Sequence, residues 1–151
     1  MRARRVSGLR PDMELGEAAR RSVRVRADEL RSFVPRALDP AEPEALHDMR
    51  IAAKRLRYLL EVMEPALGPK AGKAAGRARD LQDVLGDIHD CDVMIPRVQA
   101  RMAALDAEAG PRDPAYRGLA VLAADLRTRR ARLFDDFRAL WEDMRPDGLL
   151  G

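Results

Sequence analysis

The sequence is poor in the residues that favour β-strands. Among its 151 residues it has nine Val, three Ile and one Thr, and it has no Asn. Ala and Arg, which favour helices, contribute 25 residues each. This imbalance predicts an all-α protein.

Other absences narrow the class of protein. The single cysteine, Cys91, excludes an intramolecular disulfide and a zinc site built from several thiolates. No apolar stretch approaches the roughly 18 residues that a membrane-spanning helix needs, and residues 1–10 lack the apolar core of a secretory signal. There is also no Gly-rich phosphate loop, serine-nucleophile motif or dinucleotide fingerprint. We therefore expect a cytoplasmic protein that is not an enzyme and that holds no metal or cofactor.

The net charge is small, but it is unevenly distributed. The chain has 28 basic and 25 acidic residues, and 25 of the basic residues are Arg. Residues 1–36 hold 10 basic and 5 acidic side chains, whereas residues 37–151 hold 18 and 20. A site for an anion must therefore arise from the way charges are sorted in space and not from their sum.

Proline and glycine divide the chain into helical segments. Asp39, Pro40 and Glu42 have the order of a helix cap, a first helical residue and a capping-box acid, and Asp113 before Pro114 is a second cap. Pro96 is expected to bend a long helix. We predict a flexible basic arm over residues 1–11, a helical domain over 12–145 and a short C-terminal tail over 146–151. The domain is expected to be an antiparallel four-helix bundle, with helices over 12–38, 39–66, 70–108 and 113–144.

Apolar residues follow each predicted helix at alternating steps of three and four, which is the pattern of a core-facing stripe. Cys91 lies in such a stripe and is therefore expected to be a small buried side chain and not a nucleophile. Trp141 is expected to cover one end of the core. The stripes of the second and third helices comprise Leu46, Met49, Ala53, Leu56, Leu60, Met63 and Leu67, and Leu81, Val84, Ile88, Cys91, Ile95, Val98, Met102 and Leu105.

A second stripe on the second helix carries one sign of charge. It consists of His47, Arg50, Lys54 and Arg57, which we call the basic row. At about 100° per residue these side chains share a narrow face about 15 Å long, beside the apolar stripe. Opposite charges usually alternate on solvated helices, so a row of one sign favours a ligand with several phosphates.

The third helix carries a matching row of acids at the same spacing. An antiparallel neighbour could use these acids to neutralise the basic row in a ladder of salt bridges, which would leave no ligand site. Alternatively, some of the carboxylates could orient guanidinium groups toward a ligand. The residues of this acidic row are Asp80, Asp83, Asp87 and Asp90.

Two stretches resemble the signatures of one family, the CHAD (conserved histidine α-helical) domains. Residues 46–61 (LHDMRIAAKRLRYLLE) match the form H-x-x-R-x-x-x-K-R-L-R-Y, and residues 80–93 (DLQDVLGDIHDCDV) match L-Q-x-x-L-G-x-x-x-D-x-x-V. Both occur in the expected order and separation. The resemblance covers about residues 40–100.

The resemblance implies an all-helical module that binds inorganic polyphosphate without catalysis, and that is often found at cytoplasmic polyphosphate granules. Matching the signature position by position assigns ligand binding to His47, Arg50, Lys54, Arg55 and Arg57. Family members typically contain two such bundles with the anion channel between them. The single bundle here therefore implies either a homodimer that rebuilds the double bundle or a half-channel that binds weakly. Further cations that could contribute are Arg20, Arg24, Lys70, Lys73, Arg77, Arg127 and Arg130.

Three other interpretations fit parts of the sequence. A nucleic-acid-binding helical protein would use the Arg-rich arm, although the few aromatic residues offer little surface for base stacking. The dipeptides His47-Asp48 and His89-Asp90 superficially match metal-dependent HD phosphohydrolases. A purely structural bundle would pair the two charged rows internally.

Overall fold

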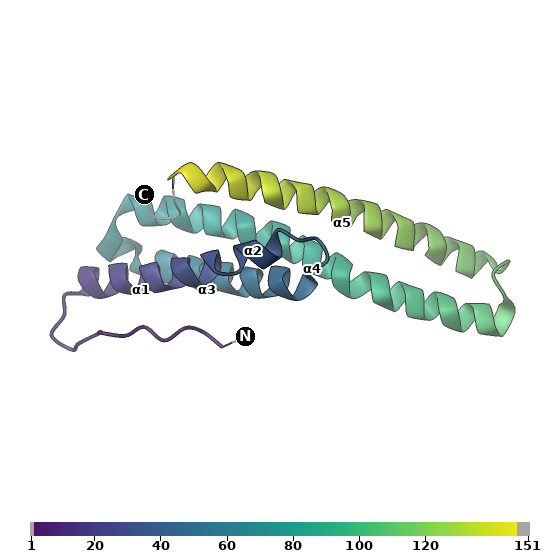
Figure 1. The fold of residues 1–151 in the computed structure, drawn as a ribbon, viewed down its shortest axis with the longest axis horizontal. Coiled ribbons are helices and arrows are strands. Elements are labelled where there is room, and N and C mark those ends of the chain that lie inside the picture. The colour runs from purple at the N-terminus through teal and green to yellow at the C-terminus, as the bar shows by residue number, and fades with distance from the viewer. Residues whose placement is uncertain (1, 148–151) are drawn as a thin grey trace.

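The computed structural model of the chain confirms an all-α helical bundle. The structure describes residues 2–147, without the side chains of Ala109 and residues 145–147. Within that range it has four long helices and one short one (Figure 1). They are α1 (Leu15–Arg31), α2 (Val34–Ala37), α3 (Pro43–Leu67), α4 (Pro69–Ala109) and α5 (Pro114–Asp147).

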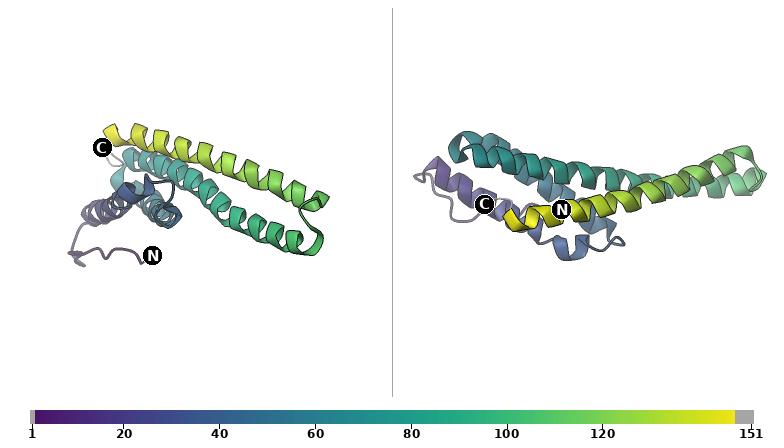
Figure 2. Two further views of the ribbon diagram at one scale, coloured as in Figure 1. Left: turned by 45° about the vertical axis from the view of Figure 1, so that its right-hand side comes forward. Right: turned by 90° about the horizontal axis from the view of Figure 1, so that it is seen from above.

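The long helices pack in the order of the sequence. α1 packs on α3, α3 on α4, and α4 on α5, each antiparallel to the next (Figure 1). Because α4 has 41 residues and α5 has 34, their distal halves extend as a two-helix hairpin beyond the part that α1 and α3 cover (Figure 2). Within the described residues, no helix is long and apolar enough to cross a membrane.

Prolines shift the boundaries predicted for the first two helices. α1 ends at Arg31 and not at Leu38, because Pro35 has no N–H to donate to the carbonyl of Arg31, and Pro35 instead occupies the start of α2. The next long helix, α3, begins at Pro43 and not at residue 39. The helical conformation is disfavoured for the residue before a proline. Glu42, which precedes Pro43, therefore stays outside α3. Asp39 therefore accepts a hydrogen bond from the Ala41 N–H in the preceding turn instead of capping a helix.

The later boundaries agree more closely with the prediction. The Asp113 carboxylate accepts a hydrogen bond from the Ala115 N–H at 2.7 Å, as expected of the cap of α5. α4 runs through Pro96 and is curved (Figure 2). α5 continues to Asp147, so the first two residues of the predicted tail belong to this helix, and residues 148–151 lie outside the described part.

One core joins all the long helices. Leu46, Leu56 and Leu60 of α3 are buried with Leu81 and Ile88 of α4, as their spacing predicts. Cys91 and Trp141 are buried too, while Met63, Val84, Ile95 and Leu105 are half-buried. α1 and α5 also contribute to the core cluster, with Val23, Ala27, Leu30, Phe134, Phe137 and Met144.

The buried carboxylate of Glu29 links α1 to α3 and to the N-terminal segment. Glu29 is 1% exposed and accepts hydrogen bonds from the guanidinium groups of Arg26 and Arg55. It also accepts one from the backbone N–H of Arg4, and Arg26 donates to the Arg4 carbonyl. The N-terminal segment therefore contacts α1 near its C-terminal end. The flexibility predicted for residues 1–11 stays a prediction.

Candidate anion-binding site

The basic row lies at the junction of α3 and α4. The rings of His47 and His89 lie with their centroids 4.4 Å apart and their planes inclined by 34°, and the Arg50 guanidinium lies over Gly86. Glu64, farther along α3, lies against Gly72. Each step toward the C-terminus of α3 is thus matched by a step toward the N-terminus of α4, which fixes the register of the pair. By this register Lys54 lies opposite Gln82.

Several polar atoms along this junction are buried and make no hydrogen bond. His47 and Arg50 are half-buried, Arg57 has 15% of its side chain exposed, and Lys54 is exposed. Three side-chain nitrogens are buried and make no hydrogen bond: His47 Nδ1, Arg50 Nε and Arg57 Nε. The acceptor Gln82 Oε1 is also buried and makes none. Unsatisfied buried polar atoms are costly in a folded protein, so several in one row indicate a place for water or for a ligand.

The acidic row of α4 does not pair with the basic row. Gly86 and His89 face α3, whereas Asp87 forms an ion pair with Arg129 of α5 at 3.5 Å. All four acids are exposed; at 100° per residue Asp80 shares the side of Asp87, whereas Asp83 and Asp90 lie between Asp87 and Gly86. Among residues 2–147 no ion pair joins the two rows, so the salt-bridge ladder considered as an alternative is absent there.

One acid and one aromatic ring mark the C-terminal end of the basic row. Glu61 lies 3.6 Å from Arg57 Nε and accepts a hydrogen bond from Arg79 of α4 at 2.7 Å. The Tyr58 ring has Arg57 at 4.5 Å and Lys54 Nζ at 5.7 Å from its centroid. Both cations therefore lie against the ring of Tyr58, which is itself exposed.

The other residues of the sequence-based assignment are dispersed. Arg55 points away from the basic row and binds the buried Glu29 at 3.2 Å. Arg130 forms an ion pair with Asp92 and donates to the Pro40 carbonyl. Arg127 lies in a hollow of the α4–α5 hairpin with Tyr116, and Lys73 and Arg77 lie in the first turns of α4. A separate cavity between α1, α3 and α4 is lined by Arg20, Arg24 and Lys70, among other residues. Their role in ligand binding stays a prediction.

Sequence reasoning missed the α4 wall of this site. Gln82, Gly86 and His89 recur at steps of four and three, the same spacing that identified the basic row, and the first two belong to the second signature. These residues do not form a row of one charge, so nothing in the sequence indicated that they would lie beside the basic row. The packing of α3 on α4 places them there.

Gly86 gives Arg50 the room to lie across α4. A Cβ at position 86 would sit 3.3 Å from Arg50 Nε, which is closer than ordinary van der Waals contact. We expect Gly86→Ala to weaken anion binding severalfold by displacing the guanidinium. The same change should leave stability equal or raise it by up to about 1 kcal/mol, because Ala favours helices over Gly. Anion titration and thermal unfolding of the same variant check both effects. A loss of stability with unchanged binding would contradict this role.

His47 responds to its surroundings. Its burial, the adjacent His89 and Arg50 lower its pKa below the ordinary 6.5, although Asp48 opposes them, so the imidazole is neutral at pH 7. A bound phosphate would favour the protonated ring. We therefore expect the affinity for a polyanion to rise as the pH falls below 6.5, with proton uptake on binding.

Without ligand, a fall in pH has the opposite effect at His47, because it lowers the stability of the fold. The pKa of His47 is lower in the folded chain than in the unfolded chain, so its stabilising contribution is present above pH 6.5 and is lost as the pH falls. His47→Gln should reduce both pH dependences. Calorimetry in buffers of different ionisation enthalpy measures the proton uptake, and thermal unfolding across the same pH range measures stability. Identical pH profiles for the variant and the parent would contradict this prediction.

Two features bear on catalysis. Among the described residues, no group of three or more His, Cys, Asp or Glu side chains is placed to hold a metal ion. The buried Cys91 thiol has its pKa raised by burial, so it stays protonated at neutral pH, as expected for a core side chain.

Comparison with known proteins places this geometry in a family. The model of the family described as CHAD domain matches residues 2–99, which include α1, α2, α3 and α4 as far as Gln99. No curated protein and no solved structure matches the chain. The match covers well over half of the sequence and both signature stretches. The chain therefore belongs to the CHAD domain family.

Proposed function

We propose that the chain binds inorganic polyphosphate, without catalysis, along the junction of α3 and α4. The observation that supports this most is the row of buried side-chain nitrogens on His47, Arg50 and Arg57 that make no hydrogen bond. The CHAD family is linked in general to polyphosphate binding. The function would place the chain at cytoplasmic polyphosphate granules.

The geometry suits a linear polyanion. Successive members of the basic row stand three or four residues apart, which is one helical turn of about 5.4 Å. Each Arg can present paired N–H donors to neighbouring phosphate oxygens, and Lys54 adds an exposed point charge. Gln82, Gly86 and His89, which form the opposite wall, carry no carboxylate that would repel the ligand.

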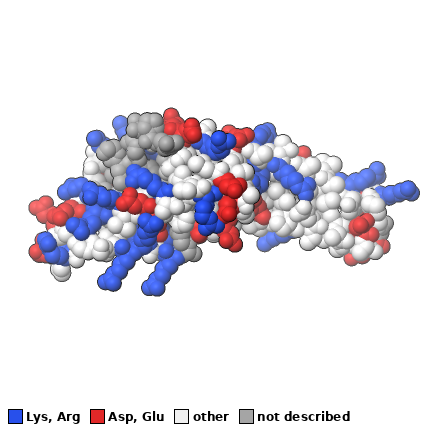
Figure 3. Space-filling model, in the orientation of Figure 1, with Lys and Arg blue, Asp and Glu red and all other residues white. Residues whose placement is uncertain are grey.

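We also propose that two copies associate. The hairpin of α4 and α5 exposes Met94 (41%), Val121 (62%) and Leu122 (42%), which two helices alone cannot bury. On the face seen in Figure 3 much of this hairpin surface is uncharged, whereas Lys and Arg gather toward the α1 end. A second copy would cover these apolar side chains and supply the second bundle that the CHAD resemblance implies.

One experiment tests both proposals. Polyphosphate is titrated into the protein at two salt concentrations while the molecular mass is measured. We expect saturable binding that weakens steeply with salt, through release of counterions, and a mass of two chains. Duplex DNA or RNA that displaces polyphosphate at equal phosphate concentration would contradict a preference for polyphosphate. Release of phosphate with added Mg²⁺ or Mn²⁺ would contradict a non-catalytic role. A mass of one chain would refute the dimer alone.

A further inference from the structure

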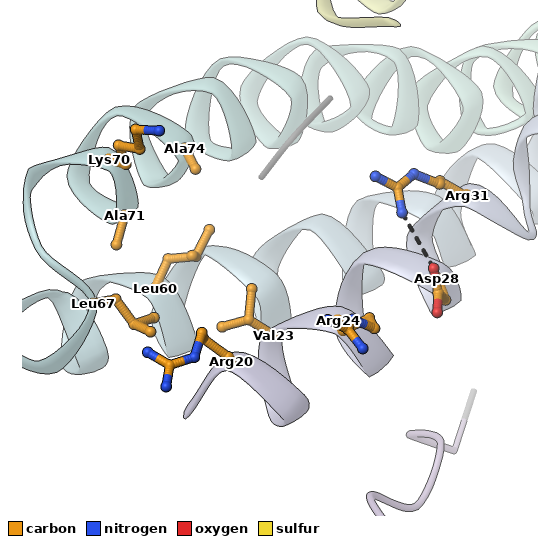
Figure 4. A pocket seen from close by; sticks show the side chains of 10 residues that line it. All are labelled: Arg20, Val23, Arg24, Asp28, Arg31, Leu60, Leu67, Lys70, Ala71 and Ala74. Atoms are coloured by element: carbon orange, nitrogen blue, oxygen red, sulfur yellow. Dashed lines mark hydrogen bonds and ion pairs between the residues drawn. The ribbon is translucent and has the colours of Figure 1, made fainter. Parts of the chain in front are cut away.

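A cavity lies apart from the basic row, among α1, the end of α3 and the start of α4. Its volume is about 590 Å³, within the usual range for small-molecule sites. It shares no lining residue with the basic row. Figure 4 shows its lining residues: Arg20, Val23, Arg24, Asp28 and Arg31 of α1, Leu60 and Leu67 of α3, and Lys70, Ala71 and Ala74 of α4.

The lining has two chemical parts. Val23, Leu60 and Ala71 are buried members of the core, and together with Leu67 and Ala74 they form an apolar floor. The charged side chains stand around this floor. In Figure 4 the Lys70 ammonium group and the Arg31 guanidinium point toward the hollow from opposite sides. A ligand in this cavity would meet hydrocarbon at one end and cations at the other.

The cations outnumber the acid that could neutralise them. Asp28 is the one acid in the lining, and it pairs with Arg31 at 3.1 Å. Arg20, Arg24 and Lys70 form no ion pair or hydrogen bond through their side chains with the residues that the structure describes. Three unneutralised cations around a concave, partly apolar site attract an anionic group.

We propose that this cavity binds a free amphipathic organic anion, a small molecule with one carboxylate or phosphate group and an apolar body. A chain of phosphates alone would leave the apolar floor without a matching partner, and a neutral hydrocarbon would leave the cations unpaired. A molecule with both parts satisfies the floor and the rim together. This site is independent of the polyphosphate function.

The test uses decanoate, with decanol and inorganic phosphate as probes that each lack one part. Binding is followed by calorimetry on the full chain. We expect one decanoate per chain, with affinities at least about tenfold weaker for decanol and for phosphate. Arg24→Gln with Lys70→Gln should weaken decanoate binding about tenfold or more through loss of charge-assisted hydrogen bonds. Arg50→Gln and the matched exposed pair Arg97→Gln with Arg101→Gln should leave it unchanged.

A second variant tests the apolar floor without a change of charge. Ala74→Leu would fill part of the cavity and should abolish decanoate binding while the helical circular dichroism is retained. Equal affinity for decanol and decanoate, or displacement of decanoate by polyphosphate, would overturn the proposal. So would binding to anionic phospholipid vesicles that is lost in the Arg24 and Lys70 variant, because the cavity would then serve a membrane surface. Decanoate binding that survives both variants would place the ligand elsewhere.

Discussion

Replacing Arg50 and Lys54 by Gln is expected to weaken polyphosphate binding by about a hundredfold or more at low salt. Each cation makes charge-assisted hydrogen bonds to phosphate worth roughly 1.5–3 kcal/mol, and a factor of ten corresponds to about 1.4 kcal/mol. The slope of log affinity against log salt should fall by about 0.7–0.9 for each phosphate that the variant no longer neutralises. Titration at several salt concentrations measures both quantities.

The control for this variant removes the same charge elsewhere. Arg97 and Arg101 are exposed on α4, outside the basic row, and form no ion pair with described residues. Arg97→Gln with Arg101→Gln should change the affinity by less than about threefold, since it alters only the long-range field. Equal losses for the two pairs would show that net charge governs binding, and the assignment to the basic row would then be wrong. Neither pair should change the melting temperature by more than a few degrees.

Glu29→Ala is expected to destabilise the fold by about 3–5 kcal/mol. The carboxylate is buried and accepts hydrogen bonds from Arg26 and Arg55, so its removal leaves two poorly solvated cations side by side. It also removes the acceptor of the Arg4 N–H. For a chain of this size the loss corresponds to a fall of about 10 °C in melting temperature. Thermal and urea unfolding measure it.

The preceding residue of α1 supplies the matched control. Asp28 pairs with Arg31 on the surface, with 56% and 45% of the two side chains exposed, so Asp28→Ala should cost less than about 1 kcal/mol. If Glu29→Ala and Asp28→Ala were equally mild, Glu29 would not fasten α1 to α3. Because Arg55 forms an ion pair with Glu29, Arg55→Gln should lower the stability of the fold more than it lowers the affinity for polyphosphate.

The charged residues on the two sides of α3 thus have different roles. Arg55 binds Glu29 on the side of α1, and the basic row follows the junction with α4. The signature K-R-L-R places Lys54, Arg55 and Arg57 within four residues, yet the helical turn separates Arg55 from the other two by 100° or more. A local motif can therefore contain both a positioning cation and ligand-facing cations.

The sequence by itself determined the properties that depend on periodicity and composition. The scarcity of β-branched residues predicted the all-α fold, and the alternating steps of three and four identified the buried faces of Leu56, Leu81 and Cys91. The basic row followed from the same arithmetic, because the angle between residues of one helix is fixed. The start of α3 did not follow in this way, since two prolines, at positions 40 and 43, each fit the first turn of a helix.

Only the tertiary structure decided which rows face each other. The register between α3 and α4 depends on how side chains pack, and it set His47 against His89 and Arg50 against Gly86 while turning Asp87 toward Arg129 of α5. Periodicity gives the angle of a row about its own helix, but it leaves open the rotation of a neighbouring helix. That rotation left the two rows without an ion pair between them among the described residues, and it left nitrogens of His47, Arg50 and Arg57 buried without a hydrogen bond.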